Sequence, residues 1–273
     1  MGTHSSPSVL VIILFVFVFM QTLVFVSASA ASSNISCLES ERKALLAFKQ
    51  SLVDESNLLS SWTGEDCCAW HGVQCNRRSR YVFKIDLHNP IDFNNDDDWY
   101  SYDVFSLRGQ ISNSLQNLKN LTYLDLSMNN FLGAQVPEFF ASLKNLRYLN
   151  LSYSKLGGLI PRDLGKLSSL QYLDLHYNDF NGSLPTEIRN LAQIRHLDLS
   201  FNKFQGSIPA QIFSNLTKLE IFDVSVNNFS GSIPVEIFEN LTQIRKLHLS
   251  NNKFIGSLPE ARTNLFKGVR YQQ

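Results

Sequence analysis

The chain has 273 residues, among them 24 lysine and arginine residues and 24 aspartate and glutamate residues, so its formal net charge at pH 7 is zero. This balance gives no general signal for a protein that binds DNA, RNA or another polyanion. We therefore expect no nucleic acid among its partners.

The first residues carry a pattern for export. Residues 9–26 are apolar except for Gln21 and Thr22, and small residues follow from Ser27 to Ala31. An apolar stretch that ends in small residues is typical of a secretory signal peptide, which we assign to residues 1–31. An uncleaved signal anchor is the alternative, because the stretch approaches the length that spans a membrane. We expect a secreted protein or one on the extracellular side of the plasma membrane.

All four cysteines lie close together near the start of the exported part, at Cys37, Cys67, Cys68 and Cys75. In an exported chain an even, clustered set indicates disulfide bonds, of which three connectivities are possible. Cys67 and Cys68 are poor partners for each other, because a bond between adjacent residues strains the disulfide geometry. A zinc site is the competing interpretation, but export favours oxidation, so we expect no metal here.

From Leu124 onward, a block of 24 or 25 residues recurs. The first strand position of the block is occupied by Leu124, Leu149, Leu173, Leu197, Phe222 and Leu247. An asparagine column follows five residues later, with Ser154 as its exception, at Asn129, Asn178, Asn202, Asn227 and Asn252. A phenylalanine or leucine, a glycine and a proline complete each block. A fixed period in this range predicts stacked structural units rather than one globular core.

Each part of the block predicts one part of a coil. The Leu-x-Leu segment has period 2, so it predicts a short strand with both leucines inward, and stacked strands build a parallel sheet. Asparagine can donate and accept, so its column can satisfy buried backbone groups at the turn. The phenylalanine column predicts an apolar spine, and glycine and proline predict a short, irregular or weakly helical return. The expected fold class is an α/β solenoid.

An earlier, interrupted block also fits the frame. Ile85 and Leu87 occupy its strand positions, and Leu107 occupies its phenylalanine position. The distance from Ile85 to Leu124 is 39 residues, which is one period of 24 plus an insertion of 15. We therefore expect about seven repeats over residues 81–259, an island loop at 88–106 and an irregular, truncated tail at 260–273.

The island loop is rich in aspartate and aromatic residues and has no lysine or arginine. We expect a solvated insertion, with a lid over a basic ligand as the alternative. The chain also has seven Asn-x-Ser/Thr sequons, whose density suits a glycosylated extracellular protein although the repeat itself generates some of them. The expected glycosylation sites are Asn34, Asn120, Asn150, Asn181, Asn215, Asn228 and Asn240.

Residues that alternate with the inward leucines form columns on the outer side of the predicted sheet. Aromatic side chains on a rigid sheet are good binding anchors, although they could also serve only to cover the sheet. A glycan on Asn150 would obstruct part of this face. The predicted ligand-binding residues are Tyr148, Tyr153, Tyr172, Tyr177, His196 and Phe201.

His196, Asp198 and Ser200 suggest a catalytic triad, but they alternate along one strand and so lie side by side on a surface. The aspartates of neighbouring coils could raise one another's pKa, an effect that solvent would limit. The sequence has no phosphate loop or kinase signature. We expect no enzymatic activity, no cofactor and no metal.

The repeats, such as "IRHLDLSFNKFQGSIP" with its Gly-x-Ile-Pro ending, resemble those of plant extracellular leucine-rich repeat proteins. The segments "CLESERKALLAFKQSL" and "DCCAWHGVQC" are similar to the N-terminal cap of these proteins, which places a cap at residues 32–80. The resemblance implies a curved, right-handed superhelix with a parallel sheet on its concave face, and disulfide bonds Cys37–Cys67 and Cys68–Cys75. We expect the cap helix to present an apolar stripe at Leu38, Leu45, Phe48 and Leu52, with Trp62 and Trp70 packed against it.

Within this subclass, the island loop and "SLKNLRYLNLSYSKLGGLIP" resemble the N-terminal part of receptor-like proteins of plant defence. Such proteins continue into a membrane helix and signal through partner receptor kinases. The resemblance implies an extracellular module that recognises a protein or peptide ligand in plant innate immunity. A receptor kinase partner is expected if the chain is part of a full-length receptor, with membrane attachment through a C-terminal helix that is missing here. The alternatives are a secreted inhibitor of a pathogen's cell-wall-degrading enzyme, similar to polygalacturonase-inhibiting proteins, and a truncated decoy or non-functional fragment.

Overall fold

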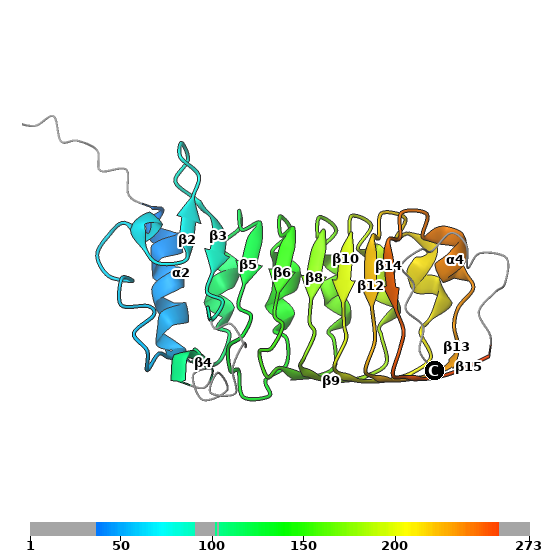
Figure 1. Ribbon diagram of the computed structural model, residues 1–273. Coiled ribbons are helices and arrows are strands. Elements are labelled where there is room, and N and C mark those ends of the chain that lie inside the picture. Colours follow the sequence, from blue (N-terminus) through cyan, green and yellow to red (C-terminus); the bar gives the residue numbers. More distant parts are fainter. Residues whose placement is uncertain (1–36, 91–101, 103, 257–273) are drawn as a thin grey trace, which may run out of the picture. The chain divides into compact units, whose positions relative to one another are not determined.

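The computed structural model describes residues 37–90, 102 and 104–256, all within one compact unit (Figure 1). The predicted signal peptide, Asn34, most of the island loop and the tail at 260–273 lie outside the described residues. Among the described residues, no helix has the length and the apolar character needed to cross a membrane.

A cap of mixed structure closes one end of the stack of coils. It contains helix α2 (Glu39–Gln50), strand β1 (Leu52–Val53), the 3-10 helix η1 (Cys67–Ala69) and strand β2 (Val73–Cys75). Disulfide bonds join Cys37 to Cys67 and Cys68 to Cys75, as the resemblance implies. They hold the segment just before α2 and the end of β2 to the same short 3-10 helix.

The apolar stripe of the cap helix differs in part from the prediction. Leu45 and Phe48 are buried, but Leu38 precedes the helix as its N-cap residue and is 44% exposed. Leu52 follows the helix in β1, where it pairs with Gly109 of strand β4 (Arg108–Gly109). The helix is shorter than the stripe because its backbone leaves the helical conformation at both of these positions. Trp62 and Trp70 are both buried: Trp62 lies beside Phe48, and the two tryptophan rings stack with centroids 5.4 Å apart.

The strand positions of the repeats form the long sheet, which starts at β2 in the cap and continues through strand β3 (Val82–Asp86). Its other strands are β5 (Tyr123–Asp125), β6 (Tyr148–Asn150), β8 (Tyr172–Asp174), β10 (His196–Asp198), β12 (Ile221–Asp223) and β14 (Lys246–His248). From β3 to β14 all pairs are parallel, and Leu149 lies opposite both Leu124 and Leu173, as the repeat frame predicts.

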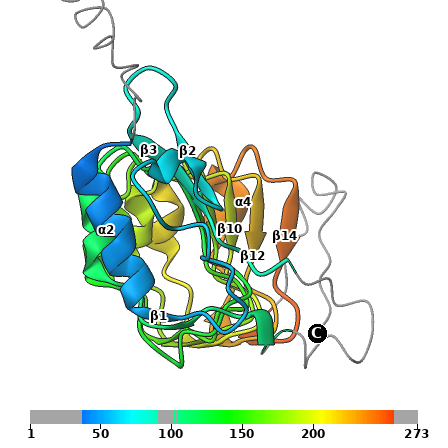
Figure 2. The same cartoon turned by 90° about the vertical axis from the view of Figure 1, so that its left-hand side faces the viewer.

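A second parallel sheet runs along one edge of the stack, where the sequence predicted an irregular return. Its strands are β7 (Gly157–Gly158), β9 (Asp179–Gly182), β11 (Lys203–Gly206), β13 (Asn228–Ser232) and β15 (Lys253–Ile255). Short helices cover the side opposite the long sheet, namely η2 (Asn113–Asn117), η3 (Glu138–Ser142), η4 (Arg162–Lys166), η5 (Thr186–Asn190), η6 (Ala210–Ser214) and α4 (Glu236–Asn240). Figure 2 looks along the stack, with α2 on the helical side and β10, β12 and β14 on the other.

The core lies between the sheets and the helices. The strand leucines are fully buried, and the rings of Phe180, Phe204, Phe229 and Phe254 stack at centroid distances of 6.2, 5.8 and 6.3 Å. The predicted phenylalanine spine is therefore confirmed, and with it the parallel-sheet solenoid and its disulfide-bonded cap. The backbone N–H of Leu107 donates to Asn129 Oδ1 at 2.9 Å, as that of Phe180 donates to Asn202 Oδ1 at 3.0 Å, which supports the interrupted first repeat.

Glu41 of α2 joins the cap to the long sheet through a buried carboxylate. The residue is 3% exposed, and its Oε2 accepts a hydrogen bond from the backbone N–H of Val82 at 2.7 Å. Burial raises the pKa of Glu41 above its usual value, and the hydrogen bond from Val82 offsets only part of that effect. The folded protein therefore holds the Glu41 proton more tightly than the unfolded chain does.

This pKa shift predicts a pH-dependent stability of the cap. The contribution of Glu41 is fully present below its unfolded pKa of about 4.3 and is lost as the pH rises through the higher folded pKa. Glu41→Gln keeps an oxygen that can accept from Val82 but carries no charge. Its melting temperature should equal that of wild type near pH 4 and exceed it increasingly toward pH 7. The exposed Glu138→Gln serves as the control, and a constant difference for Glu41→Gln across this range would contradict the prediction.

Candidate functional site

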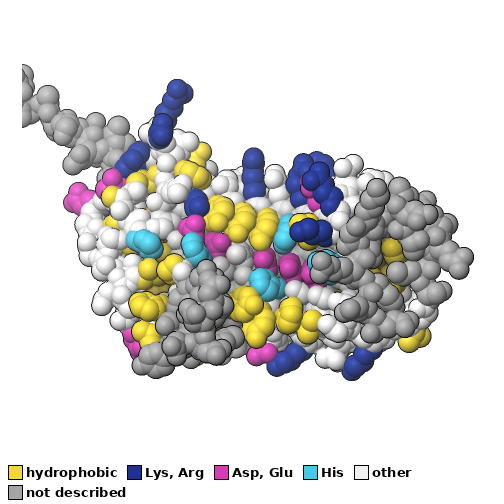
Figure 3. Space-filling model, in the orientation of Figure 1, with side chains coloured by type: hydrophobic (Ala, Val, Ile, Leu, Met, Phe, Trp, Pro, Cys, Tyr) yellow, Lys and Arg dark blue, Asp and Glu magenta, His cyan; other side chains and the backbone are white. Residues whose placement is uncertain are grey.

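The outward face of the long sheet carries two aromatic rows with a row of carboxylates between them (Figure 3). We define the first ridge as Tyr123, Tyr148, Tyr172 and His196. We define the second ridge as Tyr153, Tyr177 and Phe201. We define the acidic row as Asp125, Asp174, Asp198 and Asp223. Each set repeats one position of the strand or of its end, so the parallel register places its members side by side.

The first ridge is a continuous stack of rings. Successive centroids from Tyr123 to His196 are 4.1, 4.3 and 4.2 Å apart, with interplanar angles of 4°, 11° and 13°. Lys84 Nζ lies 4.0 Å from the centroid of the Tyr123 ring and extends the stack by a cation–π contact. Burial, with help from nearby carboxylates, raises the pKa of Tyr123, Tyr148 and Tyr172, so these phenols stay protonated and can donate hydrogen bonds.

The second ridge stands on strained backbone. Tyr153, Tyr177 and Phe201 have φ angles of 51°, 54° and 51°, in the left-handed region that bulky residues rarely adopt. Each such residue costs about 1–3 kcal/mol, which the surrounding hydrogen bonds must offset. The conformation turns the rings outward, so Tyr177 and Phe201 are 40% and 47% exposed. Tyr153 and Tyr177 stack at 4.2 Å, and Tyr177 and Phe201 lie 5.6 Å apart in a tilted arrangement.

The acidic row is held in place by residues two positions further on. Ser200 donates to Asp198 Oδ1 through its backbone N–H at 2.9 Å and its hydroxyl at 2.6 Å, and Ser127 and Ser225 contact their aspartates in the same way. In the coil of Asp174 the serine is replaced by His176, whose Nδ1 lies 2.7 Å from Asp174 Oδ1.

Two aspartates of the acidic row have a shifted pKa, and only one of them shows the expected effect of neighbouring carboxylates. Burial, together with the charges of Asp174 and Asp223, raises the pKa of Asp198. Burial alone would raise the pKa of Asp174 as well, but the hydrogen bond and charge of His176 reverse the effect and lower it. The sequence expectation is therefore wrong for Asp174, because it did not include the histidine two residues away.

The six predicted ligand-binding residues fall on two ridges. The structure brings Tyr148, Tyr172 and His196 together on the first, and places the other three on the second. The prediction missed Tyr123 and Lys84, although Tyr123 occupies the same repeat position as Tyr148 and was therefore identifiable from the sequence. In the suspected triad, the Ser200 hydroxyl donates to Asp198 and not to His196, so the three residues do not form a nucleophile–base pair.

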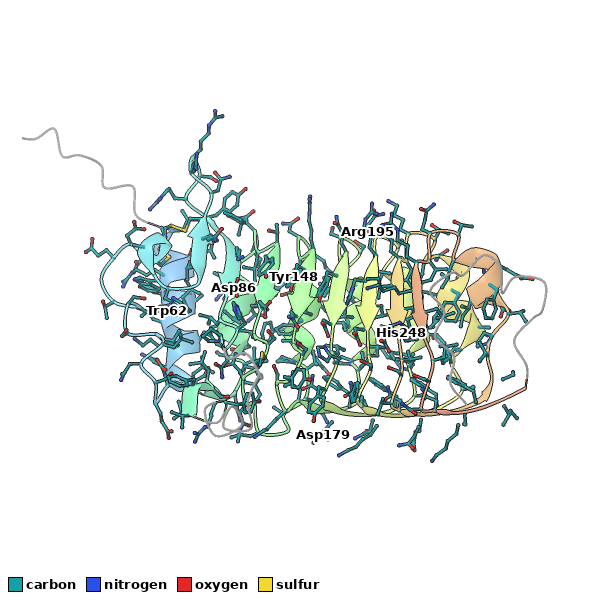
Figure 4. All side chains as sticks on the ribbon, viewed as in Figure 1. Trp62, Asp86, Tyr148, Asp179, Arg195 and His248 are labelled. Carbon is teal, nitrogen blue, oxygen red and sulfur yellow. A yellow bond between two sulfur atoms is a disulfide. The ribbon has the colours of Figure 1, made fainter. Side chains whose placement is uncertain are left out.

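A hollow of about 350 Å³ borders the second ridge where it meets the second sheet. Its lining includes Tyr177, Phe201 and the ion pair of Asp179 and Lys203, whose charged atoms are 2.6 Å apart. Figure 4 shows Asp179 at this edge of the stack and Tyr148 on the long sheet. Near the other end of the ridge, Tyr102 Oη lies 2.9 Å from the Tyr153 carbonyl oxygen. This contact ties the end of the island loop to the base of the second ridge.

The sequon asparagines differ in their surroundings. Asn181, Asn215 and Asn228 are exposed. Asn150 lies within the face: its Nδ2 donates to Asp125 Oδ2 at 3.3 Å, and its Oδ1 accepts from the Ser152 hydroxyl at 2.8 Å. A glycan on Asn150 Nδ2 would therefore disturb this contact and stand between the ridges.

Comparisons with known proteins agree with this architecture. A family model described as a leucine rich repeat N-terminal domain matches residues 38–76, and one described as a leucine-rich repeat region matches residues 100–264. Receptor-like proteins EIX1 and EIX2 of Solanum lycopersicum are 39% and 37% identical to the chain over 127 and 125 residues, which is 45% of this chain. The matches cover 12% of each relative, so the chain spans about an eighth of the length of these curated relatives.

Solved structures of plant receptors share the fold. The crystal structure of PEPR1-AtPEP1 aligns with a TM-score of 0.71 and 29% identity over 85% of this chain and 31% of that chain. The ectodomain of the Arabidopsis receptor kinase HAESA, in complex with an IDA peptide hormone ligand, has a TM-score of 0.55 and 28% identity over 85% of this chain and 44% of that chain. Since the repeat model alone covers more than half of the residues, the chain belongs to the leucine-rich repeat family, and it resembles plant receptor-like proteins.

Proposed function

We propose that this chain is an extracellular recognition module that binds an extended peptide, or an extended segment of a protein, across the two ridges. The main support for this proposal is the pair of aromatic ridges on one rigid sheet, with an acidic row between them. Stacked rings supported by neighbouring strands lose little conformational freedom on binding, and aromatic residues dominate the energetics of many interfaces.

The shape of the surface favours a long ligand over a compact one. The first ridge crosses four strands, from β5 to β10, and the second follows three of the same coils, from β6 to β10. Pockets for small molecules enclose most of their ligand, whereas this face is open along the stack. Of the two similar structures, HAESA is in complex with an IDA peptide hormone ligand, and PEPR1 is with AtPEP1. These likenesses support a peptide ligand for this chain without identifying it.

The relatives also suggest where the protein acts and in what kind of process. Similarity to receptor-like proteins of Solanum lycopersicum supports a receptor role at the cell surface or in the extracellular space, and the resemblance of the repeats suggests that this role lies in plant defence. If the chain is part of a longer receptor, a receptor kinase would be its signalling partner. The disulfide-bonded cap and the exposed sequons are consistent with an oxidising, extracellular compartment.

Removing one ring from each ridge is expected to weaken peptide binding strongly. Displayed random 12-residue peptides would be selected on the secreted wild-type protein, and their dissociation constants measured by biolayer interferometry. Tyr172→Ala combined with Tyr177→Ala should reduce affinity at least roughly 100-fold, since central aromatic anchors contribute about 2 kcal/mol or more each.

The matched control removes apolar surface elsewhere. Leu132→Ala combined with Leu159→Ala changes two exposed residues, 71% and 57% accessible, that lie outside the long sheet. Its affinity for the selected peptides should equal that of wild type. Equal binding by the ridge variant would contradict the proposed site, and failure to select any peptide would contradict the proposed ligand class.

A further inference from the structure

Three side chains of types that can bind metal ions converge where the first ridge meets the acidic row. Asp174 on β8 lies opposite Asp198 on β10, and His196 precedes Asp198 by two residues on the same face. One ring nitrogen of His196 and one carboxylate oxygen from each aspartate lie within 4.8 Å of one another. Zinc binds nitrogen and oxygen ligands at about 2.0–2.2 Å, so a single ion could contact all three after small side-chain rotations.

The three side chains are oriented by other groups, and His196 and Asp198 each retain an unused ligand atom. His196 is stacked on Tyr172, and its Nε2 is buried without a hydrogen-bond partner among the described residues. A buried nitrogen left in this state destabilises the fold unless a ligand satisfies it. Ser200 fixes Asp198 through Oδ1, and in the described part of the chain no donor contacts Asp198 Oδ2. His176 and Tyr172 hold the two oxygens of Asp174.

The next coil shows that this arrangement is not a general property of the repeat. There the position of His196 is taken by Ile221, and the position of Asp198 by Asp223. Asp223 Oδ2 already has a partner, because His248 Nδ1 lies 2.6 Å from it. Thus the Asp223 coil offers a neighbouring carboxylate with the same serine contact, but its second oxygen is taken by His248 and it has isoleucine at the position of His196.

We propose that Asp174, His196 and Asp198 form a binding site for a divalent transition-metal ion, with zinc as the best fit. Imidazole nitrogen suits zinc and copper, whereas magnesium and calcium prefer sites made of oxygen ligands. The hydrogen bonds from Ser200 and His176 to the carboxylates resemble the supporting contacts that orient metal ligands in proteins. Three protein ligands leave one position for water or for a donor atom of a bound ligand. This inference stands independently of the proposed peptide recognition.

The test uses the full chain, secreted from eukaryotic cells, purified without a histidine tag and freed of metal by EDTA. Calorimetric titration with zinc chloride should show one saturable site per chain, and magnesium chloride should show none. His196→Ala and Asp198→Asn should each weaken zinc binding by at least about tenfold, whereas Asp223→Asn should leave it unchanged. Far-UV circular dichroism before titration checks that each variant is folded.

Cobalt(II) provides a second readout, because its visible absorption reports direct coordination. Wild type and Asp223→Asn should give the same cobalt spectrum, and His196→Ala should lose it. Absence of saturable zinc binding by wild type would overturn the proposal. Zinc binding that survives both His196→Ala and Asp198→Asn would also overturn it, because the ion would then lie elsewhere on the chain.

Discussion

Asn178→Ala is expected to lower the free energy of unfolding by about 4 kcal/mol. Asn178 Oδ1 accepts hydrogen bonds from the backbone N–H groups of Ser154 at 3.1 Å and Leu156 at 2.9 Å. Its Nδ2 donates to the carbonyl oxygens of Leu151, at 2.8 Å, and Leu175, at 3.0 Å. Alanine would leave the two buried N–H groups without acceptors, and each such group costs about 1–3 kcal/mol. Urea denaturation followed by circular dichroism measures the loss.

Ser154 is a natural control for this prediction, because it occupies the asparagine position one coil earlier. Its hydroxyl lies 2.9 Å from the Leu126 carbonyl oxygen and 3.0 Å from that of Ser152, to which it can donate. Ser154→Ala removes this single donor and should cost about 1 kcal/mol. Equal costs for Ser154→Ala and Asn178→Ala would show that the bonds between coils do not set the stability of the stack.

The repeat period predicted those parts of the fold that depend on side-chain burial. The inward leucines, the asparagine column and the phenylalanine spine are each carried by a residue type that recurs at one position, so the sequence shows them directly. The second sheet has no such signal. Its strands, such as β9 and β11, pair because successive coils repeat the same backbone conformation, which the side chains around Asn181 and Gln205 do not reveal. The start of α2 was misplaced at Leu38 because an apolar stripe does not mark a helix end.

The sequence predicted which face of the sheet carries the candidate site, but it did not predict how the side chains on that face are arranged. Alternation along each strand placed Tyr148 and Tyr172 outward, and the structure stacks them. The left-handed backbone at Tyr153 and Tyr177 has no signature in the sequence, since tyrosine seldom adopts it, and this conformation separates the second ridge from the first. The pairing of His176 with Asp174 depends on side-chain rotamers, so the lowered pKa of Asp174 could not be inferred from a list of aspartates.

Removing the disulfide bond Cys37–Cys67 should destabilise the protein more than removing Cys68–Cys75. The two bonds close segments with sequence separations of 30 and 7 residues. If a disulfide acts mainly by restricting the unfolded chain, these lengths correspond to stabilisation of the folded protein by about 3.6 and 2.4 kcal/mol, respectively. The longer closure also holds the start of α2, whose buried Leu45 and Phe48 cover the first coil. The paired alanine variants of each bond should therefore differ in urea midpoint in this order.

Comparing the two double variants shows whether the cap unfolds together with the repeats or on its own. If the cap folds as part of the same cooperative unit as the repeats, both pairs of alanine substitutions shift a single transition, with Cys37→Ala/Cys67→Ala shifted further. If the cap unfolds on its own, the Cys37→Ala/Cys67→Ala variant shows an early transition in tryptophan fluorescence, because Trp62 and Trp70 lie in the cap. The far-UV transition of the repeats would then stay at the wild-type midpoint. A larger loss for Cys68→Ala/Cys75→Ala would contradict the loop-length argument, because strain or packing around η1 would then outweigh chain entropy.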